Sequence, residues 1–198
     1  MAGKKSFEPN TATAAILEVF REKGFSETSV ADLEAATGLN RSSLYSTFGN
    51  KQQIFLQVLQ MHQQTVETEL IKELEHIDIV CALRNLFEFQ LTGLSKQKLP
   101  LGCVVTNSCA RIGCYESSVE ESIGDILTQL EAAILDRLIR AQTAGELKAS
   151  ADVHKLSRFF SGISRSLPLL FRATGDIEYA RDVAMVSLSA LNAEILTA

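Results

Sequence analysis

The spacing of apolar residues constrains the fold of this chain more than any other feature of its sequence. Apolar side chains recur every three to four positions through most of the 198 residues. This period places them on one side of an α-helix, whereas a strand would need strict alternation. Only 3 prolines and 11 glycines interrupt the pattern. We therefore predict an all-α fold of about nine helices.

The limits of the expected helices follow from prolines, glycines and capping residues. Two short helices are expected between residues 29 and 48. The next stretch, from Lys51 to about Glu75, has no breaker and predicts one long helix. The other expected helices cover residues 14–25, 77–94, 100–113, 116–144, 152–173 and 176–196.

Composition excludes several classes of protein. Hydrophobic residues make up 46% and charged residues 22%, as in average globular proteins, which excludes intrinsic disorder. No apolar run reaches the roughly 20 residues of a membrane span. The first residues, MAGKK, are not followed by the apolar core of a secretory signal. We expect a cytoplasmic protein without a membrane partner.

The net charge of −5 at first argues against a nucleic-acid partner. Residues 1–60, however, carry 6 basic and 6 acidic side chains, and the rest of the chain carries 13 and 18. The acidic surplus therefore lies entirely beyond residue 60. The N-terminal part has to be judged from its own pattern.

The last two expected helices are apolar on two sides. A helix of this kind has two neighbours to pack against. We predict that the second face of each helix forms a homodimer interface; the alternative is one thick core within a single chain. The expected interface residues are Phe159, Gly162, Ile163, Ser166, Val183, Val186 and Ala190.

Residues 28–55 have the pattern of a helix-turn-helix. Ser29 can cap a short helix that carries Leu33 and Ala36 on one face, and Gly38 can supply a turn with positive φ. Asn40 can cap a second short helix with Leu44 and Phe48 facing inward. Ala36 is expected where the two helices cross closely. Two helices of about two turns joined by a tight turn match a DNA-binding motif, although an ordinary helical hairpin would look similar.

The outward face of the second helix favours contact with DNA. It carries short hydroxyls, one guanidinium and one phenol, which can reach phosphates or base edges. Lys51 follows at the start of the next helix, where free N–H groups also attract phosphate. No acidic residue occurs between Glu34 and Glu67, so this segment is locally positive. The candidate DNA-contact residues are Ser29, Asn40, Arg41, Ser42, Ser43, Tyr45, Ser46, Thr47 and Lys51.

At these residues the chain resembles the TetR family of bacterial transcriptional regulators. The segment AAILEVFREKGF is similar to the first helix of the family, and LYSTF matches its Leu-Tyr-x-x-Phe motif, with Lys51 at the family's lysine position. The sequence GEL at residues 145–147, followed by Asp152, looks like the family's loop into its dimerising helices. The resemblance is specific over about residues 10–60 and architectural beyond them.

The resemblance implies a homodimer that places each recognition helix in a major groove of a pseudo-palindromic operator. Ser29, Tyr45 and Lys51 would contact phosphates, whereas Arg41, Ser42, Ser43 and Thr47 would lie near bases. The family often has an aromatic residue or histidine where this chain has Ser46 and Thr47, so base recognition would depend more on Arg41 and Tyr45. The implied domains are a DNA-binding domain at residues 1–50 and an effector-binding and dimerisation domain at residues 51–198.

Four cysteines, at positions 81, 103, 109 and 114, raise the question of metal or redox chemistry. No two of them have CxxC spacing and the three histidines are scattered, which argues against zinc. In one continuous helix, Cys103 and Cys114 would lie about 16 Å apart, beyond the reach of a disulfide. We expect free thiols, no metal and no cofactor.

The resemblance also implies a pocket for an unknown small-molecule effector, whose binding moves the helix at residues 51–75. Cys103 is the candidate sensor, because the first turn of a helix lowers the pKa of a thiol. The segment GCVVTN is similar to one in a TetR subgroup that includes electrophile-responsive repressors. A small buried apolar residue is the alternative reading of Cys103. The other candidates, which could equally be packing groups, are Met61, Phe87, Thr106 and Asn107.

The favoured function is a repressor released from its operator by a small molecule, an electrophile or an oxidant. An enzyme is not expected, since the sequence lacks a nucleophile elbow, a phosphate loop and an HExxH motif. A helical ligand-binding protein of the same fold without operator binding is the remaining alternative. Arg111, Arg165 and Arg172 are expected on the solvated surface, although they could bind an anionic effector.

Overall fold

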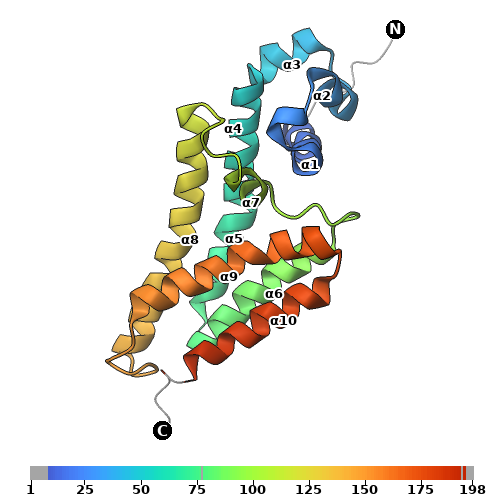
Figure 1. Cartoon of the computed structure of the whole chain (residues 1–198). Coiled ribbons are helices and arrows are strands. Elements are labelled where there is room, and N and C mark those ends of the chain that lie inside the picture. The colour runs from blue at the N-terminus through green and yellow to red at the C-terminus, as the bar shows by residue number, and fades with distance from the viewer. Residues whose placement is uncertain (1–8, 77, 193, 195–198) are drawn as a thin grey trace.

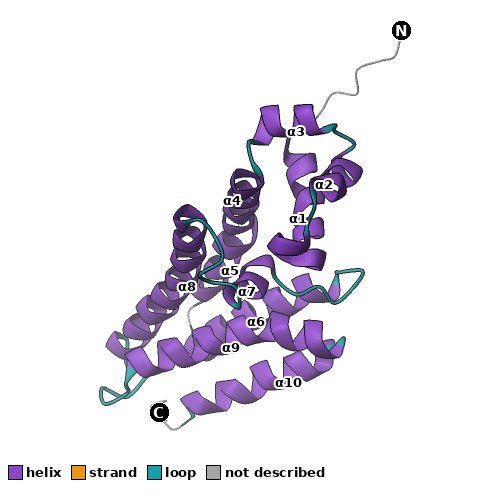
Figure 2. Cartoon of the chain, turned by 45° about the horizontal axis from the view of Figure 1, so that its top comes forward, coloured by secondary structure: helices purple, strands orange, loops and turns teal. Residues whose placement is uncertain are grey.

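The computed structural model describes residues 9–76, 78–192 and 194. These residues form helices and connecting loops (Figure 2), as the apolar spacing predicts. Two of the ten α-helices belong to one continuous helical run, so the expectation of about nine helices is confirmed for the described part of the chain. The helices are α1 (Pro9–Glu27), α2 (Val30–Thr37), α3 (Arg41–Phe48), α4 (Lys51–His62), α5 (Thr68–Lys72), α6 (Ile79–Ser95), α7 (Val104–Cys109), α8 (Ser117–Thr143), α9 (Val153–Thr174) and α10 (Ile177–Ser187). None of them is long and apolar enough to cross a bilayer.

The helices gather into two groups along one long connection (Figure 1). Helices α1, α2 and α3 lie at one end, beside the start of α4. Helices α6, α9 and α10 pack against one another at the other end. Helices α4 and α5 belong to one continuous helical run, called here the α4–α5 run. This run and α8 link the two groups. Movement of the α4–α5 run would therefore affect both.

The α4–α5 run contains one irregular turn. Between α4 and α5, residues Gln63–Glu67 form a π-helical turn, and Glu73–Glu75 close the run as a 3₁₀ turn. A π-turn inserts one extra residue into an α-helix and is frequent at functional sites. The predicted long helix at residues 51–75 is thus confirmed as a continuous helical run, with a local change of register that the sequence pattern did not indicate.

Two separate apolar cores follow from this arrangement. The first contains the buried faces of α1, α2, α3 and α4, together with Val104 and Val105 of α7 and Val119 and Ile123 of α8. The second lies among α5, α6, α9, α10 and the last part of α8. The α4–α5 run contributes to both cores, with its N-terminal half in the first and its C-terminal half in the second.

Two predicted helices are shorter than expected. The helix predicted at residues 100–113 is only Val104–Cys109, because Gly102 has φ +73° and residues 110–115 form turns, with Gly113 at φ +95°. Gln97 holds the preceding loop by accepting hydrogen bonds from the N–H groups of Leu101 and Gly102, both at 3.1 Å. The last helix ends at Ser187 and continues as a 3₁₀ turn to Leu191. The rest of its predicted range lies at the edge of the described residues or outside them.

Candidate DNA-contact surface and effector cavity

The first helix of the helix-turn-helix is fixed at both ends by its own sequence. The Ser29 hydroxyl accepts a hydrogen bond from the Asp32 N–H at 3.2 Å, and the Asp32 carboxylate accepts from the Ser29 N–H at 2.8 Å. This capping box satisfies two backbone donors that would otherwise have no partner. At the other end, Gly38 takes φ +72° and its N–H donates to the carbonyl of Glu34. The predicted cap and turn are therefore both confirmed.

The second helix is capped as the sequence predicts. The Asn40 side-chain oxygen accepts from the Ser43 N–H at 2.9 Å. Leu44 and Phe48 are buried with Leu33 in the first core. Ala36, in contrast, is exposed, so the expectation that it lies where the two helices cross is wrong. Leu33 of α2 and Leu44 of α3 are fully buried in the same core.

The outer face of α3 presents the predicted contact residues to solvent. Asn40, Arg41, Ser42, Ser46 and Thr47 are exposed, and Ser43 and Tyr45 are half-buried. The Arg41 guanidinium lies 5.5 Å from the centroid of the Tyr45 ring, within the range of a cation–π contact. These side chains form one continuous polar face on a helix whose opposite side is buried. Their contact with DNA stays a prediction.

Lys51 lies at the start of α4, close to the end of α1. Its Nζ lies 4.6 Å from the centroid of the Phe25 ring and donates to the backbone carbonyl of Ser26 at 3.3 Å. Partial burial lowers the pKa of the Lys51 ammonium. The ammonium is thus oriented by α1 while remaining beside the N-terminus of α4.

The N-terminus of α2 also carries an acidic group near the predicted phosphate contact Ser29. Lys23 donates to the Asp32 carboxylate at 2.5 Å. This hydrogen bond, together with those from the Ser29 backbone and hydroxyl, lowers the pKa of Asp32 to about 2. The Asp32 charge is therefore neutralised by a neighbour on α1, and it does not face an approaching phosphate alone.

A cavity of about 130 Å³ lies where α1, the α4–α5 run, α6, α7 and α9 meet. Its apolar wall includes Val66, Leu70, Phe89 and Leu94. Its polar lining consists of Arg21, His62, Glu67, Gln90, Gln97 and Cys103. A cavity of this size holds a molecule about as large as benzene.

Of the five predicted effector residues, only Cys103 lines this cavity. Phe87 is fully buried in the second core and Met61 is half-buried against the first. Thr106 donates to the carbonyl of Cys103 at 3.2 Å, and Asn107 donates to that of Leu101 at 2.9 Å. The structure therefore does not bring these five residues together around one space.

Four side chains form a chain of contacts beside the cavity: two from the α4–α5 run, the N-cap residue of α7 and one from α9. The Cys103 Sγ lies 3.3 Å from His62 Nε2, and the same nitrogen lies 3.5 Å from Glu67 Oε1. Arg165 donates to that carboxylate oxygen at 2.8 Å and to the carbonyl of Ile126 at 3.0 Å. His62 and Glu67 are each only 3% exposed. Arg165 was expected on the solvated surface; its side chain is instead 12% exposed and paired.

The pKa values of Cys103 and His62 differ from those of isolated side chains. Burial alone would raise the pKa of Cys103, but the charge and hydrogen bond of His62 outweigh it and bring the value to about 7. Burial likewise opposes the charge on His62, but Cys103 and Glu67 raise its pKa to about 9. Cys103 is the N-cap of α7, one residue before the predicted first turn. The backbone N–H of Thr106 in that turn also lowers the pKa of Cys103, but His62 has the larger effect.

Sequence reasoning missed His62 and Glu67, and it named Arg165 only as a surface arginine that could bind an anionic effector. The only sequence signal was a histidine and a glutamate five residues apart in a helix, a spacing that brings them together only across a π-turn. All four cysteines are free. In the described part of the chain no cluster of three or more potential ligands could hold a metal ion.

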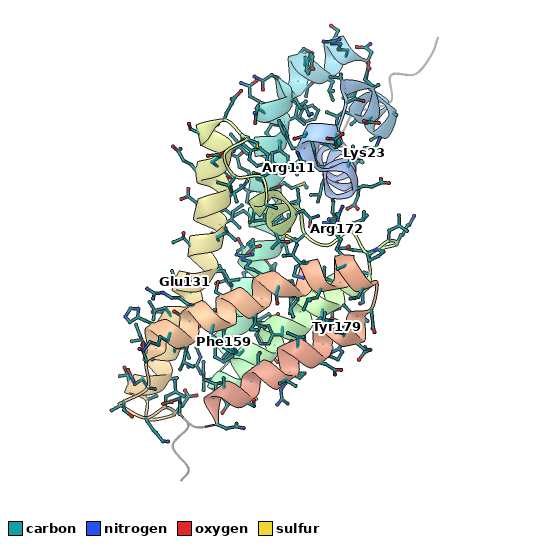
Figure 3. The ribbon with its side chains drawn as sticks, viewed as in Figure 1. Lys23, Arg111, Glu131, Phe159, Arg172 and Tyr179 are labelled. Carbon is teal, nitrogen blue, oxygen red and sulfur yellow. The ribbon has the colours of Figure 1, made fainter. Side chains whose placement is uncertain are left out.

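The predicted dimer residues belong to α9, to α10 and to the 3₁₀ turn that follows α10. Figure 3 labels Phe159 on α9 and Tyr179 on α10. Phe159 is 42% exposed and Val186 is 69% exposed. Gly162 and Ala190 are also exposed, and Ile163, Ser166 and Val183 are half-buried. Large apolar side chains therefore remain uncovered in a single chain.

Family models match both parts of the chain. The model described as bacterial regulatory proteins of the tetR family matches residues 12–58. The model described as a tetracyclin repressor-like C-terminal domain matches residues 80–186. The first match covers the helix-turn-helix, and the second covers the helices around the second core.

Similar proteins agree with these matches. The chain is 28% identical to the uncharacterised HTH-type transcriptional regulator YezE of Bacillus subtilis over 97% of this chain and 100% of that protein. It is 24% identical to the HTH-type transcriptional repressor ComR of Escherichia coli over 93% of this chain and 89% of that protein. Its fold matches that of a CifR cysteine mutant complexed with a 26-base-pair operator, with a TM-score of 0.82 and 20% identity over 95% and 99% of the two chains. The chain belongs to the TetR family of bacterial transcriptional regulators.

Proposed function

We propose that this protein is a cytoplasmic homodimeric repressor that binds a pseudo-palindromic operator through α3 and is released by a small molecule at the Cys103 cavity. The observation that carries the proposal is the α4–α5 run. Its first residue, Lys51, follows directly after the recognition helix, and its residues His62 and Glu67 line the cavity. A ligand that favours one position of this run would alter the spacing of the two recognition helices in a dimer.

The DNA contacts are proposed for the exposed face of α3 and its neighbours. Arg41, Ser42, Ser43 and Thr47 would approach base edges in the major groove. Ser29, Tyr45 and Lys51 would fix the phosphate backbone, and Asn40 would mainly hold the start of α3. Residues 1–50 would act as the DNA-binding part, and residues 51–198 would bind effector and form the dimer through the outer side of α9 and α10.

Selection of genomic DNA fragments with the purified full chain, followed by gel-shift titration, tests the operator proposal. The double variant Tyr45→Phe/Lys51→Ala should weaken operator binding about 100-fold, since each lost phosphate contact costs roughly 1–1.5 kcal/mol. The slope of log affinity against log salt should fall by about 1 for Lys51. Lys72→Ala, which removes an exposed lysine paired with Glu69, is the matched control.

The outcomes separate the two functions considered for this fold. Selection of a defined site, lost in the double variant and kept in the control, supports the repressor. A chain that selects no site at any salt concentration, yet binds small molecules, would instead be a ligand-binding protein. Unchanged operator affinity in the double variant would refute the placement of the DNA surface.

A further inference from the structure

Three buried polar atoms at the Cys103 cavity have no hydrogen-bond partner in the described structure. They are His62 Nδ1, Glu67 Oε2 and Arg21 Nε. All three residues line the cavity, and His62 and Glu67 are each only 3% exposed. Buried polar groups in native proteins nearly always have partners, so each exception calls for an explanation. Their shared position indicates a space that receives a polar molecule.

The surroundings of each residue decide whether its free atom donates or accepts a hydrogen bond. The Nε of an arginine can only donate, whereas both oxygens of a carboxylate accept. His62 Nε2 lies 3.3 Å from Cys103 Sγ and 3.5 Å from Glu67 Oε1. Burial opposes the charge on His62, but these two neighbours outweigh it and raise its pKa to about 9, so that Nδ1 carries a hydrogen at neutral pH. The cavity therefore offers two donors, Arg21 Nε–H and His62 Nδ1–H, and one acceptor, Glu67 Oε2.

The charges around the cavity favour an uncharged ligand. Arg21 is paired with Glu18 at 2.8 Å, and Arg165 is paired with Glu67 at 2.8 Å. A ligand anion would satisfy the two donors but would meet the free oxygen of the Glu67 carboxylate. A ligand cation would meet the guanidinium of Arg21 and the imidazolium of His62. Because like charges repel strongly in a buried site, the expected ligand is neutral and carries both an acceptor and a donor.

The rest of the cavity limits the size of the ligand. Its apolar wall includes Val66, Leu70, Phe89 and Leu94. Its volume of about 130 Å³ is slightly below that of an engineered apolar cavity of about 150 Å³ that binds benzene. A molecule of about six non-hydrogen atoms with a compact hydrocarbon part therefore suits the space.

We propose that the Cys103 cavity binds, without covalent reaction, the primary amide of a short branched carboxylic acid. The amide oxygen accepts from Arg21 Nε–H and His62 Nδ1–H, since a carbonyl oxygen has two lone pairs. The amide N–H donates to Glu67 Oε2, and the hydrocarbon part lies against the apolar wall. A hydroxyl would need all three groups to converge on one atom, whereas an amide divides them between two. The inference rests on the proposed function, because it names the chemical class of the releasing molecule.

Such a ligand would join the two parts of the protein. Arg21 belongs to α1, whereas His62 directly precedes the π-turn of the α4–α5 run and Glu67 ends it. A molecule held by all three residues fixes the π-turn and ties it to α1. The orientation of the DNA-binding helices relative to the α4–α5 run then depends on whether the cavity is occupied.

Isothermal titration calorimetry of the full chain with four compounds of matched size tests the chemistry without any DNA. Isobutyramide has the acceptor and the donor, 3-methyl-2-butanone has only the acceptor, isobutyrate is an anion, and isobutanol has a single hydroxyl. Isobutyramide should bind at least ~10-fold more tightly than each of the others, since a site built to hydrogen-bond a ligand group rejects analogues that lack it. Equal or tighter binding of any of the other three, or no binding of the amide, would overturn the proposal.

Variants connect the affinity to the proposed contacts. Arg21→Lys keeps the charge but lacks the Nε–H, so the amide and the ketone should lose affinity by the same factor, about 5-fold. Glu67→Gln should instead reduce the preference for the amide over the ketone, because the charged acceptor of the amide N–H is gone. Arg84→Lys, at an exposed position of α6 outside the cavity lining, should change neither. If Glu67→Gln does not fold by circular dichroism, Arg21→Lys still decides, because unchanged affinities in that variant would refute the site.

Operator release distinguishes this inference from the function on which it rests. Saturating isobutyramide should lower operator affinity by about 10-fold or more, and an amide that binds without this effect contradicts its role as the releasing molecule. A chain that binds its operator but does not prefer the amide contradicts only the inference. A chain that binds the compounds in the predicted order but selects no operator contradicts only the proposed function.

Discussion

Arg172 on α9 donates a hydrogen bond from Nη1 to the backbone carbonyl of Arg21 on α1, at 2.6 Å. The same guanidinium donates to the carbonyls of Leu101 at 2.7 Å and Glu22 at 3.2 Å. These acceptors lie close to Gly24, where α1 has non-helical backbone angles with φ +77°. One side chain therefore ties the candidate dimer helix to the end of the first DNA-binding helix; Figure 3 labels it near the end of α9.

Arg172→Ala should lower both stability and operator affinity. Loss of these charged hydrogen bonds should reduce the free energy of unfolding by about 1–2 kcal/mol, and α1 would lose its fixed orientation to α9. Urea denaturation and gel-shift titration measure the two effects. Arg158→Ala is the control, because its ion pair with Glu131 on the same face is long and exposed. Equal behaviour of both variants would show that the link to α1 does not matter.

Asn40→Ala should destabilise the recognition helix. The Asn40 side chain caps α3 through the Ser43 N–H, and loss of an N-cap costs about 1 kcal/mol. Thr47→Ala, on the exposed face, should change stability by less than about 0.5 kcal/mol while still weakening operator binding. Thermal unfolding and gel-shift titration of both variants test this difference. A Thr47→Ala variant with full operator affinity would remove Thr47 from the contact surface.

Val186→Glu should dissociate the dimer. Val186 is the most exposed large apolar residue described, on the outer side of α10, and a dimer would bury two carboxylates in an apolar interface without partners. Sedimentation velocity should show a monomer, and operator binding should be lost with it. Leu99→Glu, at another exposed apolar residue, should remain dimeric. A dimeric Val186→Glu variant would place the interface elsewhere.

Asp32 should titrate at unusually low pH. Its pKa of about 2 results first from the Lys23 hydrogen bond and then from Ser29. Because the folded value lies below the ordinary 3.8, its contribution to stability is present above pH 3.8 and is lost as pH falls toward 2. NMR titration of the Asp32 side chain in Lys23→Ala should show a pKa closer to 3.8. An unchanged value would mean that Ser29 alone holds the carboxylate.

Glu67→Ala should be among the most damaging single substitutions in the chain. It leaves the His62 and Arg165 charges buried without their shared counter-ion, which costs about 3 kcal/mol or more. Glu131→Ala removes the exposed partner of Arg158 and should cost less than about 1 kcal/mol. Urea unfolding of the two variants gives the comparison. Similar costs would indicate that water reaches Glu67 in solution.

The helix-turn-helix could be predicted from sequence because local signals determine it. Ser29, Gly38 and Asn40 each act on residues within four positions of themselves. The long helices could be predicted because their apolar spacing is regular over several turns. Local chemistry of this kind needs no knowledge of the tertiary fold.

The cavity could not be predicted in the same way. The contact between Cys103 and His62 spans 41 positions, and that between Glu67 and Arg165 spans 98. The extended helix predicted at residues 100–113 misplaced Cys103 within it, because the pattern did not reveal that Gln97 holds the loop at Leu101 and Gly102. Only the packing of α4, α7 and α9 brings these side chains into one site.

The shared first core limits how this protein can be divided for engineering. Ile16 and Phe55 pack in the same core as Val105 of α7 and Ile123 of α8. A fragment cut after residue 50 would expose the apolar faces of α1 to water. A chimera that grafts this operator specificity onto another sensor would therefore need to keep the matching segments of α4, α7 and α8, so that the exchangeable unit is discontinuous in sequence.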